Sequence, residues 1–173
     1  MSYKTSLRRI KAFAFDVDGV FTNGMVLATP DGDFLRMHNT KDGYAVRHAV
    51  AQGYPIGIIT GGDSGSIRQR FSMLGVTDVY LASRTKWADF HSFCLKYHLQ
   101  PSEVLFMGDD IPDVEVLERC GLATCPADAV HEVKKICAYI SDKSGGMGCV
   151  RDVIEQTLRL QGKWSLKSGV TSV

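Results

Sequence analysis

The feature that most constrains the fold is the segment of residues 10–19, where an apolar run stops abruptly at two acids. The run is interrupted only by Lys11, and its length and composition are typical of a buried strand. Asp16 and Asp18 follow directly, and Gly19 ends the segment. Because open α/β sheets bind their ligands at the carboxyl ends of strands, the two carboxylates are candidates for a binding site. An isolated Asp-x-Asp-Gly is equally consistent with a turn that carries solvated acids. The choice between a turn and a binding site therefore depends on other segments of the chain.

Length and composition indicate one globular domain. The chain has 173 residues, of which 45% are hydrophobic and 23% charged, and its net charge of +1 gives no indication of a nucleic-acid or membrane partner. Five cysteines without a CxxC pattern are typical of reduced thiols in the cytoplasm. No apolar stretch has the length of a signal peptide or a membrane span. We expect a single cytoplasmic domain over residues 1–173, with its core at 8–160 and a flexible tail at 161–173.

Predicted strands and helices alternate along the chain. Strands are expected at residues 10–15, 55–60, 79–81, 104–107, 122–125 and 138–140. Helices are expected at residues 40–52, 64–74 and 128–135, in segments that begin near 86 and end near 119, and in a last segment that ends near 160. This alternation favours βαβ units and predicts an α/β fold with a doubly wound, mainly parallel sheet.

A β-hairpin is predicted directly after the first strand. Residues 25–28 and 34–37 have the pattern of two short strands, and Thr29-Pro30-Asp31-Gly32 lies between them. Proline presets the φ angle of a turn, and glycine accepts a positive φ. We expect this hairpin to stand over the carboxyl end of the first strand, as a flap or as an interface.

Polar residues follow four of the predicted strands. They are Asp16 and Asp18, then Thr60 and Gly61, then Lys86, and finally Asp109, Asp110 and Asp113. Since the carboxyl ends of parallel strands meet at one edge of a sheet, these groups can converge although they are far apart in sequence. Each motif alone has an ordinary structural explanation, such as a flexible turn or a helix-start acid. Their joint occurrence at four strand ends favours a functional site.

The chemistry of these groups is complementary. Several carboxylates suit Mg²⁺, which usually binds one or two of them together with waters and a substrate phosphate. A threonine hydroxyl, glycine amides and a lysine suit the remaining phosphate oxygens. Asp16 is then available as a nucleophile, and Asp18 can transfer a proton.

These motifs resemble the four motifs of the haloacid dehalogenase superfamily of phosphatases. The resemblance extends to one branch of this superfamily. It rests on the early hairpin and on four segments: Phe-Asp-Val-Asp-Gly-Val-Phe-Thr-Asn-Gly, Ile-Ile-Thr-Gly, Met-Gly-Asp-Asp-Ile-Pro-Asp and Gly-Gly-Met-Gly-Cys-Val-Arg. That branch comprises the capless phosphatases of 3-deoxy-D-manno-octulosonate 8-phosphate, which act in lipopolysaccharide sugar biosynthesis. The resemblance covers residues 8–160, and no insertion is long enough for a cap domain.

The resemblance implies a two-step hydrolysis through an aspartyl-phosphate. Asp16 would attack phosphorus, and Asp18 would protonate the leaving sugar oxygen and later deprotonate a water. It also implies that Mg²⁺ is held by Asp16, Asp109 and the backbone carbonyl of Asp18. The phosphate would be bound by Thr60, Gly61 and Lys86. Asp110 and Asp113 would orient Lys86 and the metal's waters. The protein is then expected to be a homotetramer in which neighbouring subunits cover the active sites.

Substrate recognition is where the sequence departs from this branch. The branch usually has Asp at the position of Asn23. It also usually has Thr-Gly-Arg, and relatives that act on a nine-carbon keto-deoxy sugar acid have Thr-Gly-Glu, whereas this chain has Gly62. Gly62 and Thr22 are expected near the sugar. Arg151 is the candidate for its carboxylate, because a guanidinium matches that group.

Four alternatives remain open. The first is a phosphatase of a nine-carbon keto-deoxy sugar acid 9-phosphate, and the second is a phosphomutase, although no cap would retain a bisphosphate. A receiver-like signalling domain would also combine an aspartate, Mg²⁺, threonine and lysine, but it would place its acids differently from Asp16 and Asp18. A catalytically inactive oligomerisation module is disfavoured because all four motifs are intact.

Overall fold

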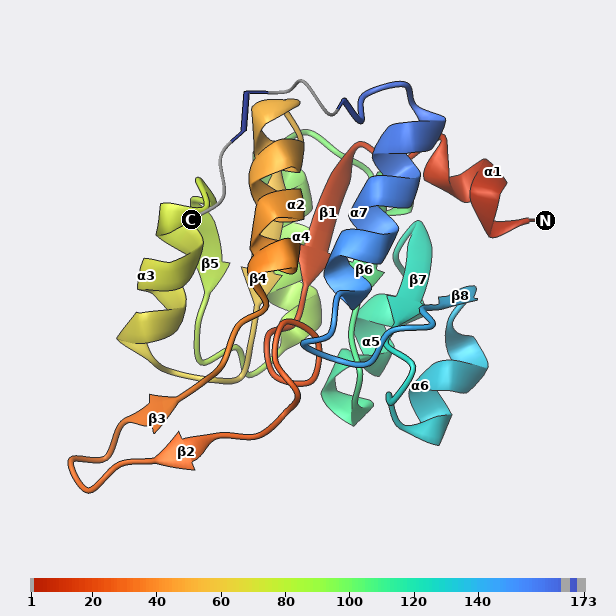
Figure 1. The fold of residues 1–173 in the computed structure, drawn as a ribbon. Helices are drawn as coiled ribbons and strands as arrows, with labels where there is room; N and C mark the ends of the chain where they lie inside the picture. Colours follow the sequence, from red (N-terminus) through yellow and green to blue (C-terminus); the bar gives the residue numbers. More distant parts are fainter. Residues whose placement is uncertain (1, 166–168, 171–173) are drawn as a thin grey trace.

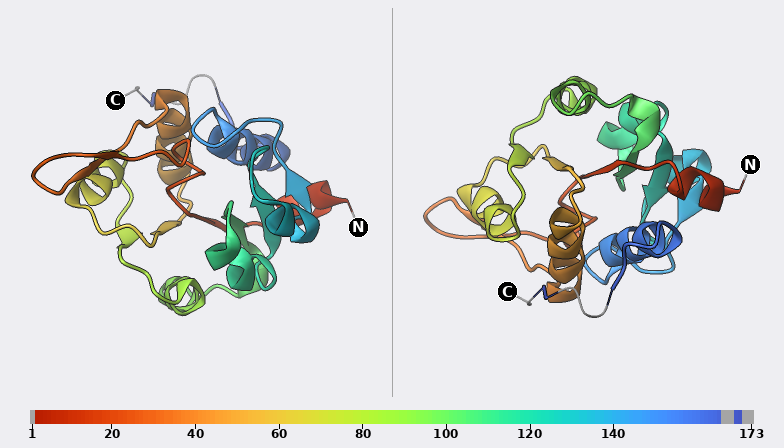
Figure 2. Two further views of the ribbon diagram at one scale, coloured as in Figure 1. Left: turned by 90° about the horizontal axis from the view of Figure 1, so that it is seen from below. Right: turned by 90° about the horizontal axis from the view of Figure 1, so that it is seen from above.

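A computed structural model describes residues 2–165 and 169–170 and shows a six-stranded parallel sheet between two layers of helices (Figures 1 and 2). The strands run in the order β5-β4-β1-β6-β7-β8, and all neighbours are parallel. Their bounds are β1 Ala12–Phe15, β4 Ile56–Ile59, β5 Asp78–Tyr80, β6 Val104–Met107, β7 Leu122–Cys125 and β8 Tyr139–Ile140. The predicted doubly wound parallel sheet is confirmed.

Helices cover both faces of the sheet. The α-helices are α1 Tyr3–Leu7, α2 Thr40–Ala51, α3 Gly65–Met73, α4 Lys86–Lys96, α5 Val114–Leu117, α6 His131–Ile136 and α7 Cys149–Leu160, and 3₁₀ turns occur at Pro101–Glu103 and at Ile111–Asp113. Buried side chains of α1, α2, α3 and α7 belong to one apolar cluster, and those of α4, α5 and α6 belong to the other. Each face of the sheet therefore has its own core.

The central strand β1 shows why the apolar run folds as it does. Phe13 and Phe15 lie in the first cluster, and Ala12 and Ala14 lie in the second. All four residues are fully buried, because successive side chains of a strand point to opposite faces and both faces are covered. β1 pairs with β4 on one side and β6 on the other, so its carboxyl end lies between two further strand ends.

The sequence predicted every strand of this sheet to within about two residues and most of the helices. It did not predict α1, Tyr3–Leu7, because five residues are too short for a periodic pattern. The helix expected up to residue 119 is shorter than predicted: a 3₁₀ turn at Ile111–Asp113 precedes the four residues of α5. α6 begins at His131 rather than at residue 128.

The predicted hairpin is present as β2 Leu27–Ala28 and β3 Phe34–Leu35, which pair antiparallel. Gly32 has a φ of +86° and donates its N–H to the carbonyl of Thr29 (2.9 Å), as expected for the turn. The hairpin does not fold back over its own strand end, because it extends away from the sheet beside α3 (Figure 1). Its tip is exposed and its base contacts the carboxyl edge of the sheet through Arg36 and Asp18, so a flap and an interface both stay predictions.

The segment after α7 packs against the rest of the protein. Gln161 donates hydrogen bonds to the carbonyls of Leu7 and Ile10 (both 2.8 Å), and the ring of Trp164 lies 4.5 Å from that of His48. These contacts argue against a free tail beginning at residue 161; residues 166–168 and 171–173 of the predicted tail lie outside the described residues. In the described ranges, no cap domain interrupts the sheet and no helix is long and apolar enough to cross a membrane.

Candidate active site

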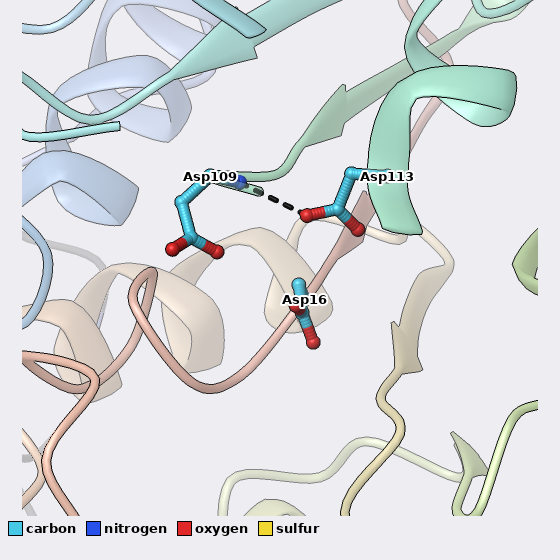
Figure 3. Close-up of side chains that lie close together, drawn as sticks. All are labelled: Asp16, Asp109 and Asp113. Atoms are coloured by element: carbon cyan, nitrogen blue, oxygen red, sulfur yellow. Dashed lines mark hydrogen bonds between the residues drawn. The ribbon is translucent and has the colours of Figure 1, made fainter. Parts of the chain in front are cut away.

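Three carboxylates from two strand ends meet at the carboxyl edge of the sheet (Figure 3). Asp16 directly follows β1, Asp109 lies two residues after β6, and Asp113 ends the 3₁₀ turn that follows. One oxygen of each lies within 4.8 Å of the others. The backbone N–H groups of Asp109 and Asp110 donate to the Asp113 carboxylate (3.0 and 3.3 Å), which fixes this side chain.

Lys86 is the cation inside this cluster. Its ammonium group is 2.7 Å from a carboxylate oxygen of Asp16 and 2.7 Å from one of Asp113. All three residues are buried. Burial disfavours the charge of Lys86, but Asp16 and Asp113 outweigh this effect and raise its pKa. A buried charge is tolerated only when it is paired, and Lys86 is held by two acids.

One lysine does not neutralise three acids. Burial, together with the charge of Asp113, raises the pKa of Asp16 to about 7 despite the contact with Lys86. Burial and the charge of Asp16 likewise raise the pKa of Asp109 to about 7. Oxygen ligands at this spacing, with more negative than positive charge, are the donor set that Mg²⁺ prefers, so the residues present fit this ion.

Two glycines make room for the carboxylates. Gly19 has a φ of +80°, and a Cβ placed there would lie 2.0 Å from Oδ2 of Asp109. A Cβ at Gly108 would lie 2.4 Å from the carboxyl carbon of Asp113. Neither position tolerates a side chain without moving an acid of the site, so these glycines are required by the geometry of the cluster.

Asp18 lies at the edge of the same site and is partly exposed. Its two oxygens accept hydrogen bonds from Nε and Nη2 of Arg36 (2.7 and 2.9 Å). The hydroxyl of Thr22 donates to Oδ1 at 3.4 Å. Arg36 follows β3, so the hairpin supplies a guanidinium that contacts a proposed catalytic acid.

These groups line one cavity of about 550 Å³. Its walls include Asp16, Asp18, Gly24, Thr60, Gly61, Gly62, Ser83, Arg84, Lys86, Asp109, Asp110 and Pro112. Thr60 is buried at the end of β4, and its hydroxyl accepts the N–H of Gly62 at 3.2 Å. The predicted convergence of four strand-end motifs is therefore present in the structure.

The remaining predicted residues lie in three different places. Asp110 lines the cavity but accepts the N–H of Ile111 (2.8 Å) and has no hydrogen bond to Lys86 among those found in the described residues. Thr22 is buried behind Asp18 and does not line the cavity. Arg151 is on α7, pairs with Glu155 at 2.9 Å and lines a separate pocket. Within one chain, the structure does not bring Arg151 to the acids.

Two further arginines at the site were not predicted. Arg84 is exposed and lines the cavity two residues before Lys86. Arg36 contacts Asp18 with a side chain that is only 7% exposed. In the two predicted hairpin strands, residues 25–28 and 34–37, Arg36 is the only charged residue, and this isolated charge is a signal of function that the sequence offered.

Asn23, the other departure in the sequence, begins the hairpin. Its side-chain oxygen accepts the N–H of Met25 at 3.1 Å, which is an Asx turn. It does not line the cavity.

Comparisons with known proteins agree with this geometry. A family model of haloacid dehalogenase-like hydrolases matches residues 65–152. The 3-deoxy-D-manno-octulosonate 8-phosphate phosphatase of Escherichia coli (strain K12) is 33% identical over 154 residues, which cover 89% of this chain and 82% of that protein. The corresponding protein of Salmonella typhi is 32% identical over 159 residues, covering 92% of this chain and 85% of that one.

Solved structures show the same fold. The crystal structure of 3-deoxy-D-manno-octulosonate 8-phosphate phosphatase from Yersinia pestis matches with a TM-score of 0.92 and 29% identity, covering 98% of this chain and 91% of that one. The phosphatase from Moraxella catarrhalis, in complex with a magnesium ion, a phosphate ion and KDO, matches with a TM-score of 0.89 and 26% identity over 92% of this chain and 91% of that one. The chain therefore belongs to the haloacid dehalogenase-like hydrolases and, among them, to the 3-deoxy-D-manno-octulosonate 8-phosphate phosphatase family.

Proposed function

We propose that this protein is a Mg²⁺-dependent phosphomonoesterase that hydrolyses 3-deoxy-D-manno-octulosonate 8-phosphate to the free sugar acid and phosphate. The observation that carries this proposal is the cavity in which Asp16, Asp18, Thr60, Lys86 and Asp109 meet. Relatives that cover most of the chain are named for this substrate. The reaction would be a step of lipopolysaccharide sugar biosynthesis, and unpaired thiols at all five cysteines support a cytoplasmic location.

Asp16 is the proposed nucleophile. One of its oxygens accepts the N–H of Val17 (2.6 Å) and the other contacts Lys86, so the carboxylate is held in one orientation at the end of β1. An Asp16 oxygen would bond to phosphorus while the bond from phosphorus to the sugar oxygen breaks, which forms an aspartyl-phosphate. A fixed nucleophile matters because phosphoryl transfer depends mainly on positioning and charge stabilisation.

Asp18 is the proposed acid and base. It is the partly exposed carboxylate beside the nucleophile, so it can reach the leaving oxygen from the open side of the cavity. Asp18 would donate a proton to that oxygen in the first step. In the second step it would take a proton from the water that attacks phosphorus, which releases phosphate and restores Asp16.

Thr60, Gly61 and Lys86 are the proposed phosphate ligands. Because the Thr60 hydroxyl accepts from the N–H of Gly62, its hydrogen can be donated to a phosphate oxygen. Lys86 has three N–H groups, and its two carboxylate contacts leave one for the phosphate. Asp16, Asp109 and the backbone carbonyl of Asp18 would hold Mg²⁺, which when bound neutralises charge on the phosphoryl group.

The hairpin supports the proposal of a homotetramer. Its exposed apolar side chains include Met25, Leu27, Phe34, Leu35 and Met37. Such a patch on a projecting element is typical of an interaction surface. A second copy of the chain would cover it, and a neighbouring subunit would then close the open side of the cavity, because no cap domain does so within the described ranges. A shielded site strengthens the electrostatic interactions on which the reaction depends.

A phosphatase screen tests the function. We expect phosphate release from 3-deoxy-D-manno-octulosonate 8-phosphate to exceed that from simple sugar phosphates, to stop on chelation of Mg²⁺ and to return when Mg²⁺ is added. The nine-carbon keto-deoxy sugar acid 9-phosphate must be included, because Gly62 has no side chain that would distinguish the two acids. A higher kcat/KM for the nine-carbon substrate would contradict the proposal and establish the alternative.

A further inference from the structure

We propose that Arg36 recognises the carboxylate of the substrate, with a guanidinium supplied by the hairpin in place of a side chain at Gly62. This inference rests on the proposed function, because it concerns the sugar-acid part of that substrate.

The position of the guanidinium is the first observation. A Cβ placed at Gly62 would lie 3.1 Å from Nη2 of Arg36. Gly62 and Asp18 line the cavity, and the same Nη2 lies 2.9 Å from Asp18, whereas Arg36 itself lines a separate pocket formed by the hairpin. Arg36 therefore occupies the space beside the cavity wall into which a side chain at position 62 would extend.

The second observation is the hydrogen bonding of Arg36. Its Nε and Nη2 bind Asp18, and its Nη1 donates to the carbonyl of Phe34 at 2.8 Å. These bonds use three of the five N–H groups of a guanidinium. In the described part of the chain, no further hydrogen bond of Arg36 is found, so one N–H on Nη1 and one on Nη2 remain for a ligand. The carbonyl of Phe34 keeps the group in place.

The third observation is the location relative to the reaction. Asp16 attacks phosphorus from one side, and the sugar oxygen leaves from the opposite side. In the proposed mechanism Asp18 donates a proton to that leaving oxygen, and Arg36 contacts Asp18. Lys86 instead contacts Asp16 and Asp113. In that mechanism Arg36 would be beside the leaving sugar acid, whereas Lys86 would be beside the phosphoryl group.

Charge and geometry then select a carboxylate. A guanidinium fork matches a carboxylate and already binds that of Asp18 through two nitrogens. A second carboxylate, from the substrate, would bind the two N–H groups that Asp18 and the carbonyl of Phe34 leave free. Such a site needs little reorganisation, because the side chain is only 7% exposed before the ligand arrives.

The test measures kcat/KM for 3-deoxy-D-manno-octulosonate 8-phosphate and for D-ribose 5-phosphate, which lacks a carboxylate, on the full-length Mg²⁺-loaded protein. Arg36→Met removes the charge, Arg36→Lys keeps it without the fork, and Arg68→Met removes a charge from the exposed face of α3 as a control. The ratio of the two values is compared, because any disturbance of Asp18 affects both substrates and cancels in the ratio.

We expect Arg36→Met to lower the ratio roughly 10- to 100-fold, the loss of a charge-assisted hydrogen bond. Arg36→Lys should retain an intermediate ratio, and Arg68→Met should retain that of the wild type. A ratio within about twofold of the wild type in Arg36→Met, with unchanged circular dichroism, would show that Arg36 only positions Asp18 and would overturn the inference.

Gly62→Arg provides the complementary test. Gly62 has no positive φ, and the nearest atom is the flexible end of Arg36, so an arginine fits once that end is removed. Gly62→Arg should restore the ratio in the Arg36→Met background and change it little in the wild type. If Gly62→Arg changed the ratio equally in both backgrounds, the two positions would act independently. That result would overturn the inference that Arg36 takes the place of a side chain at position 62. Absence of hydrolysis by the wild type would contradict the proposed substrate and this inference together, whereas hydrolysis with an unchanged ratio would overturn the inference alone.

Discussion

The edge of the sheet and the hairpin differ in almost every physical respect, although the chain connects them directly. At the edge, Asp16, Lys86 and Asp113 are at most 8% exposed and are held by one another. On the hairpin, Leu27 is 67% exposed and Met37 81%. The first region is a buried ionic cluster at the carboxyl edge of the sheet, and the second is an apolar surface on a projecting element.

This difference separates the reaction from its selectivity. Every phosphate ester offers the same phosphoryl group, so the residues that act on it can be fixed on strand ends. The group that carries the phosphate differs from one phosphate ester to another, and the hairpin carries the residue proposed to recognise it. The bidentate contact between Arg36 and Asp18 joins the two regions. Perturbing each region separately tests this division.

The largest effect is expected at the nucleophile. Asp16→Asn removes the attacking oxygen and a proposed metal ligand, and we expect kcat to fall at least roughly 10³-fold for every substrate. Circular dichroism should remain that of the wild type. The exposed Asp142, whose carboxylate pairs with Lys143 at the surface, provides the control Asp142→Asn. Turnover of Asp16→Asn within tenfold of the wild type would exclude this aspartate as nucleophile.

Lys86→Met should have the next largest effect. It keeps most of the stem but removes the charge beside the phosphate, and we expect a loss of roughly 10²- to 10³-fold in kcat. It also leaves Asp16 and Asp113 unopposed, which destabilises the fold by about 3–5 kcal/mol. Inhibition by inorganic phosphate should weaken in parallel. Lys143→Met is the surface control; if Lys86→Met lost stability but kept its rate and its phosphate inhibition, Lys86 would be a structural residue only.

A smaller effect is expected on the hairpin. Leu27 and Leu35 are direct cross-strand neighbours on the exposed hairpin, and replacing both with Asp should prevent association. We expect light scattering to report a monomer and kcat/KM to fall about tenfold, because the cavity is then open to water. Leu95→Asp, at an exposed site on α4, is the matched control. A wild type that is fully active as a monomer would disprove the shared site.

The smallest effect is a shift in thermal stability with pH and metal. The pKa values of Asp16 and Asp109 are raised to about 7, compared with about 3.9 in an unfolded chain. Between these values the folded state keeps protons that the unfolded state has lost, so the stability of the metal-free protein should fall as pH rises from about 4 to 7 and remain low above 7. Mg²⁺ binds the ionised carboxylates and should raise Tm by roughly 5–10 °C near pH 8 at 100 times its Kd.

Asp109→Asn separates this effect from other titrating groups. The variant loses one of the raised carboxyls, so its metal-free Tm should depend less on pH than that of the wild type, and Mg²⁺ should stabilise it less. Differential scanning fluorimetry of both proteins at about pH 5.5 and pH 8 measures this. If Tm depended on pH identically in the two proteins, the pKa of Asp109 would not be raised in the folded state.

The sequence alone determined the order of the elements and the residues of the sheet edge. Strands such as β1 and β6 are short, uninterrupted apolar runs that end in turn residues, and this pattern depends only on neighbours in the chain. Parallel pairing then brings all strand ends to one edge. For that reason Asp16, Thr60, Lys86 and Asp109 could be assigned to one site before their distances were known.

Only the tertiary structure decided where the hairpin and α7 lie. The direction of a hairpin depends on packing between segments far apart in the chain, which no periodicity encodes. This packing made the hairpin project from the sheet and placed Arg36 against Gly62, although the two residues are 26 positions apart in the chain. It also placed Arg151 in a different pocket, beside Glu155. Recognition residues were therefore harder to predict than catalytic ones, because their positions depend on how separate segments pack rather than on where a strand ends.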